Sequence, residues 1–337
     1  MRDGDPIDLI EAAYDLDAGP QAWLDRLAEL ANERMGEGLG LMAFRYEVSP
    51  EHRMRIGEMR GLGMPDGVPD MMRGSLEGLP PGYVERTFVR CECTTQSEVT
   101  DPEVVERNRP AREAMAAFGW RDIAMVGGMD PCGNGIYLGA WLPREKRLPE
   151  RVRTRWCRVA VHLVTAQRLR RRVPAPAPRR IDAADAVLTP GGRLEHARAD
   201  AGVEGGRAAL RDAVKALESA RGSMRRQDPD LAVATWKGLV EAQWSLVDHF
   251  ESDGKRYVVA YRNDSSDERA APLSGREREV VSRVAMGHSN KLIAYELGLA
   301  ASTVRVFVAR AAAKLGAASR EELIEAARRA ADRARRE

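Results

Sequence analysis

The sequence predicts a multidomain α+β protein that ends in an all-α domain. Two linkers support this division: a proline-rich run from Val173 to Arg180 and a polar run from Asn263 to Pro272. Successive prolines remove amide donors and force extended neighbours, so the first run cannot continue a helix. Strand-like alternation occurs before the second linker, and four helices with their start and stop signals follow it. We therefore expect domains at residues 1–173, 181–262 and 273–337.

The first domain, residues 1–173, is expected to place helices around an antiparallel sheet. Apolar spacing predicts helices between Leu9 and Met35 with a break at Gly19-Pro20, strands at Leu39–Val48 and Met54–Leu62, a short helix at Arg112–Phe118, a hairpin of Ile123–Met129 with Gly135–Leu142, and a last helix at Glu150–Arg172. Such packing gives a sensory-type α+β fold. The order of elements resembles a GAF or PAS-related domain, which implies a small-molecule effector or a dimerisation role. Trp120, Met125 and Tyr137 are candidates for lining a pocket, although such residues more often fill a core.

The middle segment, residues 181–262, predicts a small PAS-like α+β domain. Its expected elements are a strand-turn-strand unit at Ala186–Ala197 around Pro190-Gly191-Gly192, helices at Gly206–Ala220 and Pro229–Leu239, and a hairpin of Trp244–Phe250 with Arg256–Arg262. An alternative is that the helices form a dimerisation stalk and the hairpins extend the first domain.

The last 65 residues carry helix signals in close succession. Ser274 and Glu277 form a capping box that starts a first helix, and Gly287 supplies the residue that tolerates a positive φ after its end. Ser289 opens a second helix, which Gly298 breaks. A third helix is expected from about Ser302 to Leu315. This succession is a helix, a tight turn and a helix.

The third helix divides into two faces by its spacing. Val304, Val308, Ala311 and Leu315 are expected inside, and Thr303, Arg305, Val306, Ala309 and Arg310 outside. Arginine binds guanine through two hydrogen bonds, hydroxyls hold phosphates, and small apolar groups approach thymine methyls, so this outer face suits a DNA major groove. The alternative is a helical packing module with a solvated basic face.

The last segment resembles the C-terminal helix-turn-helix of the LuxR family of bacterial transcription regulators. The matching residues are Arg276, Glu277, Gly287, Ser289, Asn290, Lys291, Ile293, Ala294, Leu297, Thr303, Val304, Lys314, Leu315, Gly316 and Arg320. The resemblance implies that the third helix is the recognition helix. It also implies that the fourth helix, capped by Ser319 and Glu322, contributes to a homodimer. Double-stranded DNA is the expected partner, with RNA polymerase as a further one.

From the outer face and this resemblance we expect a set of DNA-contacting residues. The set is Ser289, Asn290, Lys291, Ser302, Thr303, Arg305, Val306, Ala309, Arg310 and Lys314. The function predicted from it is sequence-specific DNA binding by a transcriptional regulator that its N-terminal domain modulates.

Three positions depart from the family pattern. Leu292 replaces the usual Glu, which removes half of a capping box at a cost of about 1 kcal/mol. Ala300 replaces a Ser in the turn, so capping of the third helix is expected to pass to Ser302 or Thr303. Phe307 replaces His or another polar residue; we expect it to pack at the core edge, and the alternative is that it borders DNA or a protein partner.

The charge distribution supports DNA binding. Residues 273–337 carry a net charge of +5, whereas the other 272 residues carry −3, although the whole chain is only +2. A basic surface attracts phosphate without regard to sequence.

Other function classes receive little support from the sequence. The chain has no signal region or membrane-length apolar run, so a cytoplasmic location without membrane contact is expected. Phosphate-binding glycine loops, nucleophile elbows and paired histidines are absent, so neither an enzyme nor a cofactor is predicted.

Two alternative functions remain open. The helix-turn-helix could serve protein contacts, for which Phe307 is one reason. Cys91 and Cys93 could form part of a redox or metal sensor, although two sulfurs make an incomplete site.

The fourth helix carries a stripe of mostly small apolar residues. Its members are Leu323, Ile324, Ala327, Ala330, Ala331 and Ala334. Small residues permit close helix approach, so the stripe predicts a dimer interface, with coverage of the domain's own core as the alternative.

Overall fold

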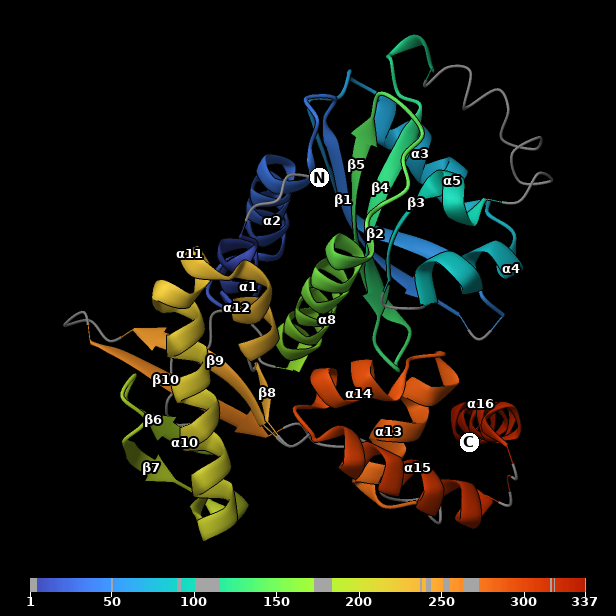
Figure 1. Ribbon diagram of the computed structural model, residues 1–337. Coiled ribbons are helices and arrows are strands. Elements are labelled where there is room, and N and C mark those ends of the chain that lie inside the picture. The colour runs from blue at the N-terminus through green and yellow to red at the C-terminus, as the bar shows by residue number, and fades with distance from the viewer. Residues whose placement is uncertain are drawn as a thin grey trace. The chain divides into compact units, whose positions relative to one another are not determined.

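The computed structural model has two compact units, Met1–Ala175 and Pro176–Glu337, each with an antiparallel five-stranded sheet (Figure 1). It describes residues 5–49, 51–89, 92–100, 116–172, 184–236, 238–240, 244–250, 255–262, 273–315, 317 and 319–336. The four helices that follow the second sheet belong to the second unit. The chain is therefore multidomain α+β with a helical C-terminal part, as predicted.

The sheet of the first unit has the strand order β2-β1-β5-β4-β3. Its elements follow in the order α1 Ile7–Ala13, α2 Pro20–Met35, β1 Leu41–Val48, β2 Met54–Leu62, α3 Val68–Glu77, α4 Pro81–Val84, a π-helical turn at Glu85–Val89, β3 Glu92–Thr95, α5 Gln96–Val99, β4 Asp122–Met129, β5 Asn134–Leu142 and α8 Glu150–Arg172. The predicted strands and hairpin agree with this. The helix predicted at Arg112–Phe118 lies largely outside the described residues.

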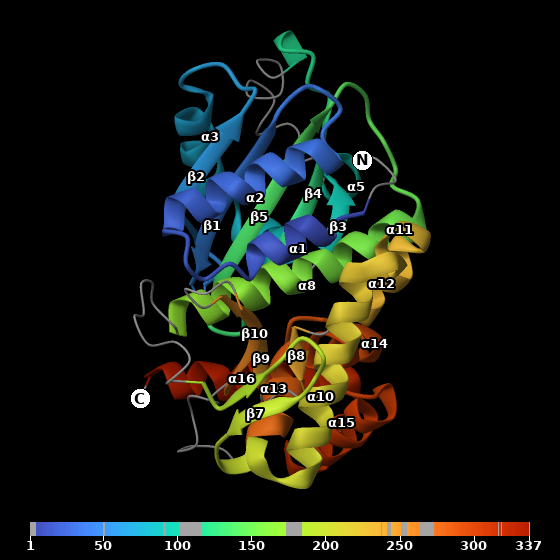
Figure 2. The same cartoon turned by 90° about the vertical axis from the view of Figure 1, so that its left-hand side faces the viewer.

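Two layers of helices cover this sheet. Figure 2 shows α1, α2 and α8 across one face. On that face the indole Nε1 of Trp23 donates to the carbonyl of Ala13 at 2.9 Å, which fixes α2 against α1. The other face packs against α3 and α4 and carries most of the aromatic residues. Glycines make room for them: a Cβ on Gly135 would lie 2.0 Å from the Tyr46 ring.

The sheet of the second unit has the strand order β7-β6-β10-β9-β8. Its elements are β6 Ala186–Leu188, β7 Leu194–Ala197, a 3-10 turn at Ala199–Gly202, α10 Glu204–Ser219, a π-helical turn at Ala220–Met224, α11 Arg225–Gln227, α12 Pro229–Thr235, β8 Leu239–Val240, β9 Trp244–Phe250 and β10 Arg256–Arg262. Leu210, Ala213 and Val214 of α10 pack against the strands. Whether residues 181–262 form an independent domain stays a prediction.

One predicted boundary in this part is wrong. The helix expected to reach Leu239 ends at Thr235, because Trp236 leaves helical geometry with ψ of 123°. Leu239 instead begins β8, which pairs with β9. A short strand of two residues has no alternation of its own, so only this pairing reveals it.

Four helices complete the chain: α13 Gly275–Ala285, α14 Asn290–Leu297, α15 Ala301–Leu315 and α16 Arg320–Arg336. Their common core includes Val280, Val284, Ile293, Leu297 and Val304. We call these four helices, residues 273–337, the head.

The head's core also contains Leu239 from β8. Gly298, in the turn between α14 and α15, has a positive φ of 64°, and a Cβ there would lie 2.2 Å from the Leu239 carbonyl oxygen. Nearby, the Tyr295 hydroxyl donates to the carbonyl of Val233 at 2.6 Å. The turn is therefore in close contact with the second sheet's backbone.

No single helix among the described residues is long and apolar enough to span a bilayer. Together α14 and the first part of α15 pass that test of length and composition, but they are bent by 109°.

Candidate nucleic-acid interface

The first helix of the head begins with the predicted capping box. The amide of Glu277 donates to Ser274 Oγ at 3.3 Å, and the amide of Ser274 donates to Glu277 Oε2 at 2.7 Å. The same carboxylate accepts from Lys314 Nζ at 2.7 Å. This hydrogen bond is the main reason that the pKa of Glu277 is lowered. Lys314 of α15 therefore ties the end of the third helix to the start of the first.

A buried charge network joins α13 to α14. Arg283 donates through Nε to Glu296 Oε1 at 2.5 Å, and its Nη1 pairs with Glu279. The other oxygen of Glu296 lies 3.0 Å from His288 Nδ1. Burial raises the pKa of Glu296, but the charge of Arg283 and the contacts with His288 and Arg283 together outweigh burial, so the pKa is lowered overall. The network therefore anchors α14 to α13 through charged side chains, each of which needs its partners to stay buried.

Sequence reasoning did not find this network. Arg283 and Glu279 are four residues apart on one helix, a spacing that the sequence shows and that allows an ion pair. Glu296 lies on another helix, so its contact with Arg283 follows only from how the helices pack.

The second helix is capped by one side chain, as the substitution at Leu292 predicts. The Leu292 amide donates to Ser289 Oγ at 3.2 Å. The helix ends at Gly298 in a left-handed conformation, and Gly287 before it also has a positive φ, of 83°. Both predicted glycine roles are confirmed.

The third helix begins one residue earlier than expected. It starts at Ala301, and the amide of Val304 donates to the carbonyl of Ala300 at 3.1 Å. The expectation that Ser302 or Thr303 caps the helix is therefore wrong, since both lie inside its first turn. Neither side chain is used as the cap, and Ser302 is exposed.

The two predicted faces of α15 are observed except at Thr303, which was expected outside and is half-buried. Val304 and Ala311 are fully buried, and Val308 and Leu315 pack against the same core. Arg305, Val306, Ala309 and Arg310 are exposed, and α15 contains no acidic residue. The guanidinium groups of Arg305 and Arg310 have no partner among the described residues. Phe307 is half-buried against the core, as our packing interpretation expects.

The predicted DNA-contacting residues at the start of α14 differ in their surroundings. Lys291 and Ser289 are exposed. Asn290 accepts through Oδ1 from Arg320 Nη1 at 2.9 Å, while Arg320 Nη2 donates to the His288 carbonyl at 2.5 Å. A DNA contact by Asn290, or by the Glu277-bound Lys314, requires a shared or exchanged partner and stays a prediction.

The fourth helix covers the head's own core with part of its stripe. The Glu322 amide donates to Ser319 Oγ at 3.1 Å, so the predicted cap is present. Leu323 and Ala327 are buried in the core cluster, and Ile324 packs against it. For these residues the alternative interpretation is correct, because α16 contacts α13 directly. Nothing is described for the side chains of Ala330, Ala331 and Ala334.

The residues considered for a pocket in the first unit fill its core. Trp120, Met125 and Tyr137 are at most 5% exposed and belong to one apolar cluster. The rings of Trp120 and Trp141 stack at 4.3 Å between centroids with an interplanar angle of 9°. The buried Nε1 of Trp141 has no hydrogen-bond acceptor among the described residues. A buried donor without an acceptor is costly.

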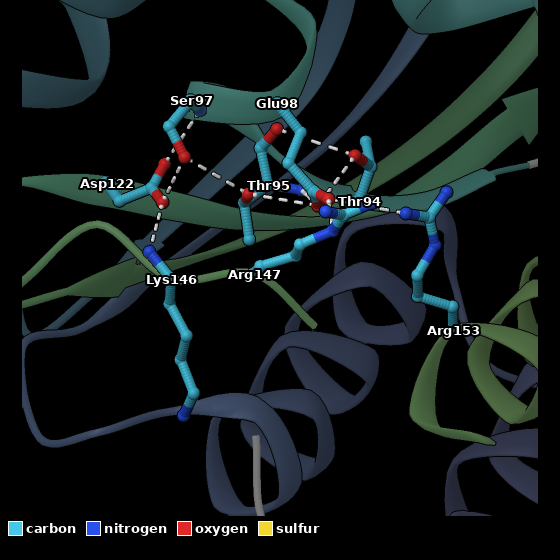
Figure 3. Close-up of polar contacts among 8 residues, drawn as sticks. All are labelled: Thr94, Thr95, Ser97, Glu98, Asp122, Lys146, Arg147 and Arg153. Carbon is cyan, nitrogen blue, oxygen red and sulfur yellow. Dashed lines mark hydrogen bonds and ion pairs between the residues drawn. The ribbon is translucent and has the colours of Figure 1, made fainter. Parts of the chain in front are cut away.

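Two carboxylates at the edge of this sheet hold α5 in place (Figure 3). Asp122 accepts from the amide and hydroxyl of Ser97 at 3.0 and 2.8 Å, and from the amide of Lys146 at 3.1 Å. Glu98 closes a capping box with Thr95 and lies 3.3 Å from Arg153 Nη1. These contacts position backbone, so we assign the group a structural role.

The cysteines do not assemble a sensor site among the described residues. Cys91 lies outside them, and Cys93 in β3 is 1% exposed. Burial is the main cause that raises the pKa of the Cys93 thiol, which keeps it protonated and unreactive. No cluster of three or more metal-ligating side chains is found in the described part of the chain.

Comparison with known proteins places the head in a family. Residues 271–327 match the family described as bacterial regulatory proteins, luxR family. The transcriptional activator RamA of Corynebacterium glutamicum is 46% identical over 57 residues, which are 17% of this chain and 20% of RamA. The transcriptional regulatory protein FixJ of Azorhizobium caulinodans is 46% identical over 56 residues, 17% of this chain and 26% of FixJ. The matches thus span about a fifth to a quarter of these relatives.

Solved structures show a distant similarity over most of the chain. Escherichia coli SdiA aligns with a TM-score of 0.33 and 12% identity, over 92% of this chain and 90% of SdiA. SdiA in complex with octanoyl-rac-glycerol aligns with a TM-score of 0.30 and 13% identity, over 97% of this chain and 96% of SdiA.

Proposed function

Since residues 271–327 form a LuxR-family helix-turn-helix domain, we propose that this chain is a sequence-specific DNA-binding transcription regulator. The observation that carries the proposal is the outer face of α15. There Arg305 and Arg310 are exposed beside the small residues Val306 and Ala309, while the opposite face is buried. Such a face enters a major groove without steric obstruction and without a carboxylate to repel phosphates.

The two arginines have different proposed roles. Arg305 lies near the start of the helix, where recognition helices contact base edges, and is assigned to a guanine. Arg310 lies five residues later and is assigned to a phosphate. Ser289, Lys291, Ser302 and Thr303 supply further phosphate contacts from the starts of α14 and α15.

Selection of bound duplexes from a random pool, carried out with the full chain, tests this function. The affinity for the selected site should fall steeply with salt concentration, since bound phosphates release counterions. The control variant is Arg329→Ala, which removes one exposed arginine from α16 and leaves the outer face of α15 unchanged. Failure to enrich any sequence would contradict sequence-specific binding.

We further propose that the first unit binds a small apolar effector. The support is the indole N–H of Trp141, a buried donor that has no acceptor among the described residues. An apolar molecule with one carbonyl oxygen would satisfy that donor. Thermal unfolding with a panel of small carbonyl compounds tests this, with Trp141→Phe as the variant that keeps the ring and loses the donor. A ligand that stabilises both proteins equally would contradict the role of Trp141.

The regulator is proposed to act as a homodimer on a two-fold-related site. Sedimentation of the full chain with and without the selected duplex tests this. One chain bound per site at saturation would contradict the dimer. The buried Leu323 and Ala327 are excluded from its interface, because they already pack inside the head.

A further inference from the structure

An open groove of ≈ 680 Å³ lies in the second unit, between the β6–β7 hairpin and α10. Figure 1 shows these elements next to one another. One wall is the hairpin, residues 191–197, and the other is formed by Arg207, Arg211 and Lys215 of α10. Neither the DNA-binding face nor the aromatic cluster of the first unit uses any of these residues.

The three cations of α10 form a row. They are spaced by four residues, so they project from the same side of the helix at intervals of about 6 Å. All three are exposed and have no charged partner among the described residues. Like charges at this spacing repel one another weakly, and an anion bound beside them would remove that repulsion.

The hairpin wall brings backbone close to these side chains. Gly192 has a positive φ of 81°, and a Cβ there would lie 3.2 Å from Arg211 Cγ and 3.5 Å from Lys215 Cε. The bare turn therefore lies against the stems of both side chains and limits where their charges can reach. On the same wall Arg193 is paired with Glu195 at 2.6 Å, so the wall's carboxylate is already neutralised. The groove keeps a positive excess.

We propose that this groove binds a small molecule with two or more phosphate groups, of the class of nucleoside di- and triphosphates. A row of about 12 Å is too long for a single phosphate and matches a chain of them. The volume of ≈ 680 Å³ falls within the range of small-ligand sites. Duplex DNA is convex and would contact the rim of such a groove but not its floor. Arg207, Arg211 and Lys215 hold the phosphates, and the hairpin lies along the rest of the ligand.

Calorimetric titration of the full chain with ATP, inorganic triphosphate and adenosine tests the proposal. ATP and triphosphate should bind, and adenosine should not. In the Arg211→Gln, Lys215→Gln double variant the affinity for both phosphates should fall at least about 100-fold, since each lost charge-assisted contact is worth about tenfold. Arg226→Gln, which removes an exposed arginine of α11, is the matched control and should bind as the wild type does.

Thermal unfolding distinguishes lost binding from lost folding. The double variant should melt no lower than the wild type without ligand, because it relieves repulsion in α10, and ATP should raise the melting temperature of the wild type only. Absence of binding by either phosphate, or equal binding by the double variant, would overturn the proposal. So would a double variant whose only defect is weaker binding to random-sequence duplex DNA, since the groove would then be a DNA backbone contact.

Discussion

Arg283 of α13 donates through Nε to Glu296 of α14 at 2.5 Å, and both side chains are at most 5% exposed. The pair holds the first two helices of the head together where water cannot replace either partner. Removing one member would leave the other charge buried.

Glu296→Gln should therefore destabilise the head by about 3 kcal/mol, because among the described residues Arg283 then keeps only Glu279 as a charged partner. Hydrogen exchange of the α13 and α14 amides in the full chain measures this. Glu325→Gln, which breaks an exposed pair with Arg329, should change the free energy of opening obtained from this exchange by less than about 1 kcal/mol. Equal effects of the two variants would show that the buried network contributes little.

Arg305→Ala should weaken binding to the selected site by roughly 1 to 3 kcal/mol and relax the preference at one base position. Arg310→Ala should weaken binding to all sequences alike and lower the salt slope by about one. Titration of single-base variants of the site at several salt concentrations separates the two cases. Unchanged binding by the double alanine variant would contradict placement of α15 in the groove.

Phe307→His should destabilise the head by about 1 to 3 kcal/mol, because a half-buried ring is replaced by a polar one against an apolar core. The preferred DNA sequence should stay the same. Val306→Ala, at the preceding residue, is the control for stability: the Val306 side chain is 47% exposed, so the free energy of unfolding should change by less than about 0.5 kcal/mol. Altered DNA preference in Phe307→His at an unshifted melting temperature would show that Phe307 borders DNA.

Acid should destabilise the first unit through His162. Burial lowers the pKa of His162 from 6.5 to about 3. Below pH 6.5 the unfolded chain gains a proton that the folded chain does not accept, so stability falls as the pH decreases from 6.5 towards 3. At pH 5 the loss is about 2 kcal/mol. In denaturant unfolding, His162→Phe should flatten this part of the profile, and an unchanged slope would show that other groups cause it.

The sequence was most informative where local signals agree. Ser274 with Glu277, the glycines at 287 and 298, and the alternation along β4 and β5 predicted elements that the structure contains. The outer face of α15 followed from helical spacing alone. These features depend on residues only a few positions apart.

Features that depend on tertiary packing escaped the sequence. The β3 strand has four residues and gains its conformation by pairing with β4. Arg283 and Glu296 meet across two helices, and Lys314 meets Glu277 from 37 positions away. The stripe of α16 was ambiguous because a core contact and a dimer contact require the same small apolar residues.

The contact of Leu239 with the head also has a consequence for protein engineering. The linker at residues 263–272 is where a fusion would naturally be cut, yet the apolar cluster of the head extends to a residue on the far side of that cut. A chimera that begins at Leu273 would leave the surface around Gly298 and Leu297 uncovered, with the Tyr295 hydroxyl deprived of its Val233 acceptor. A segment used to graft this head onto another domain therefore has to include the strands around β8, because the apolar core of the head extends beyond residues 273–337.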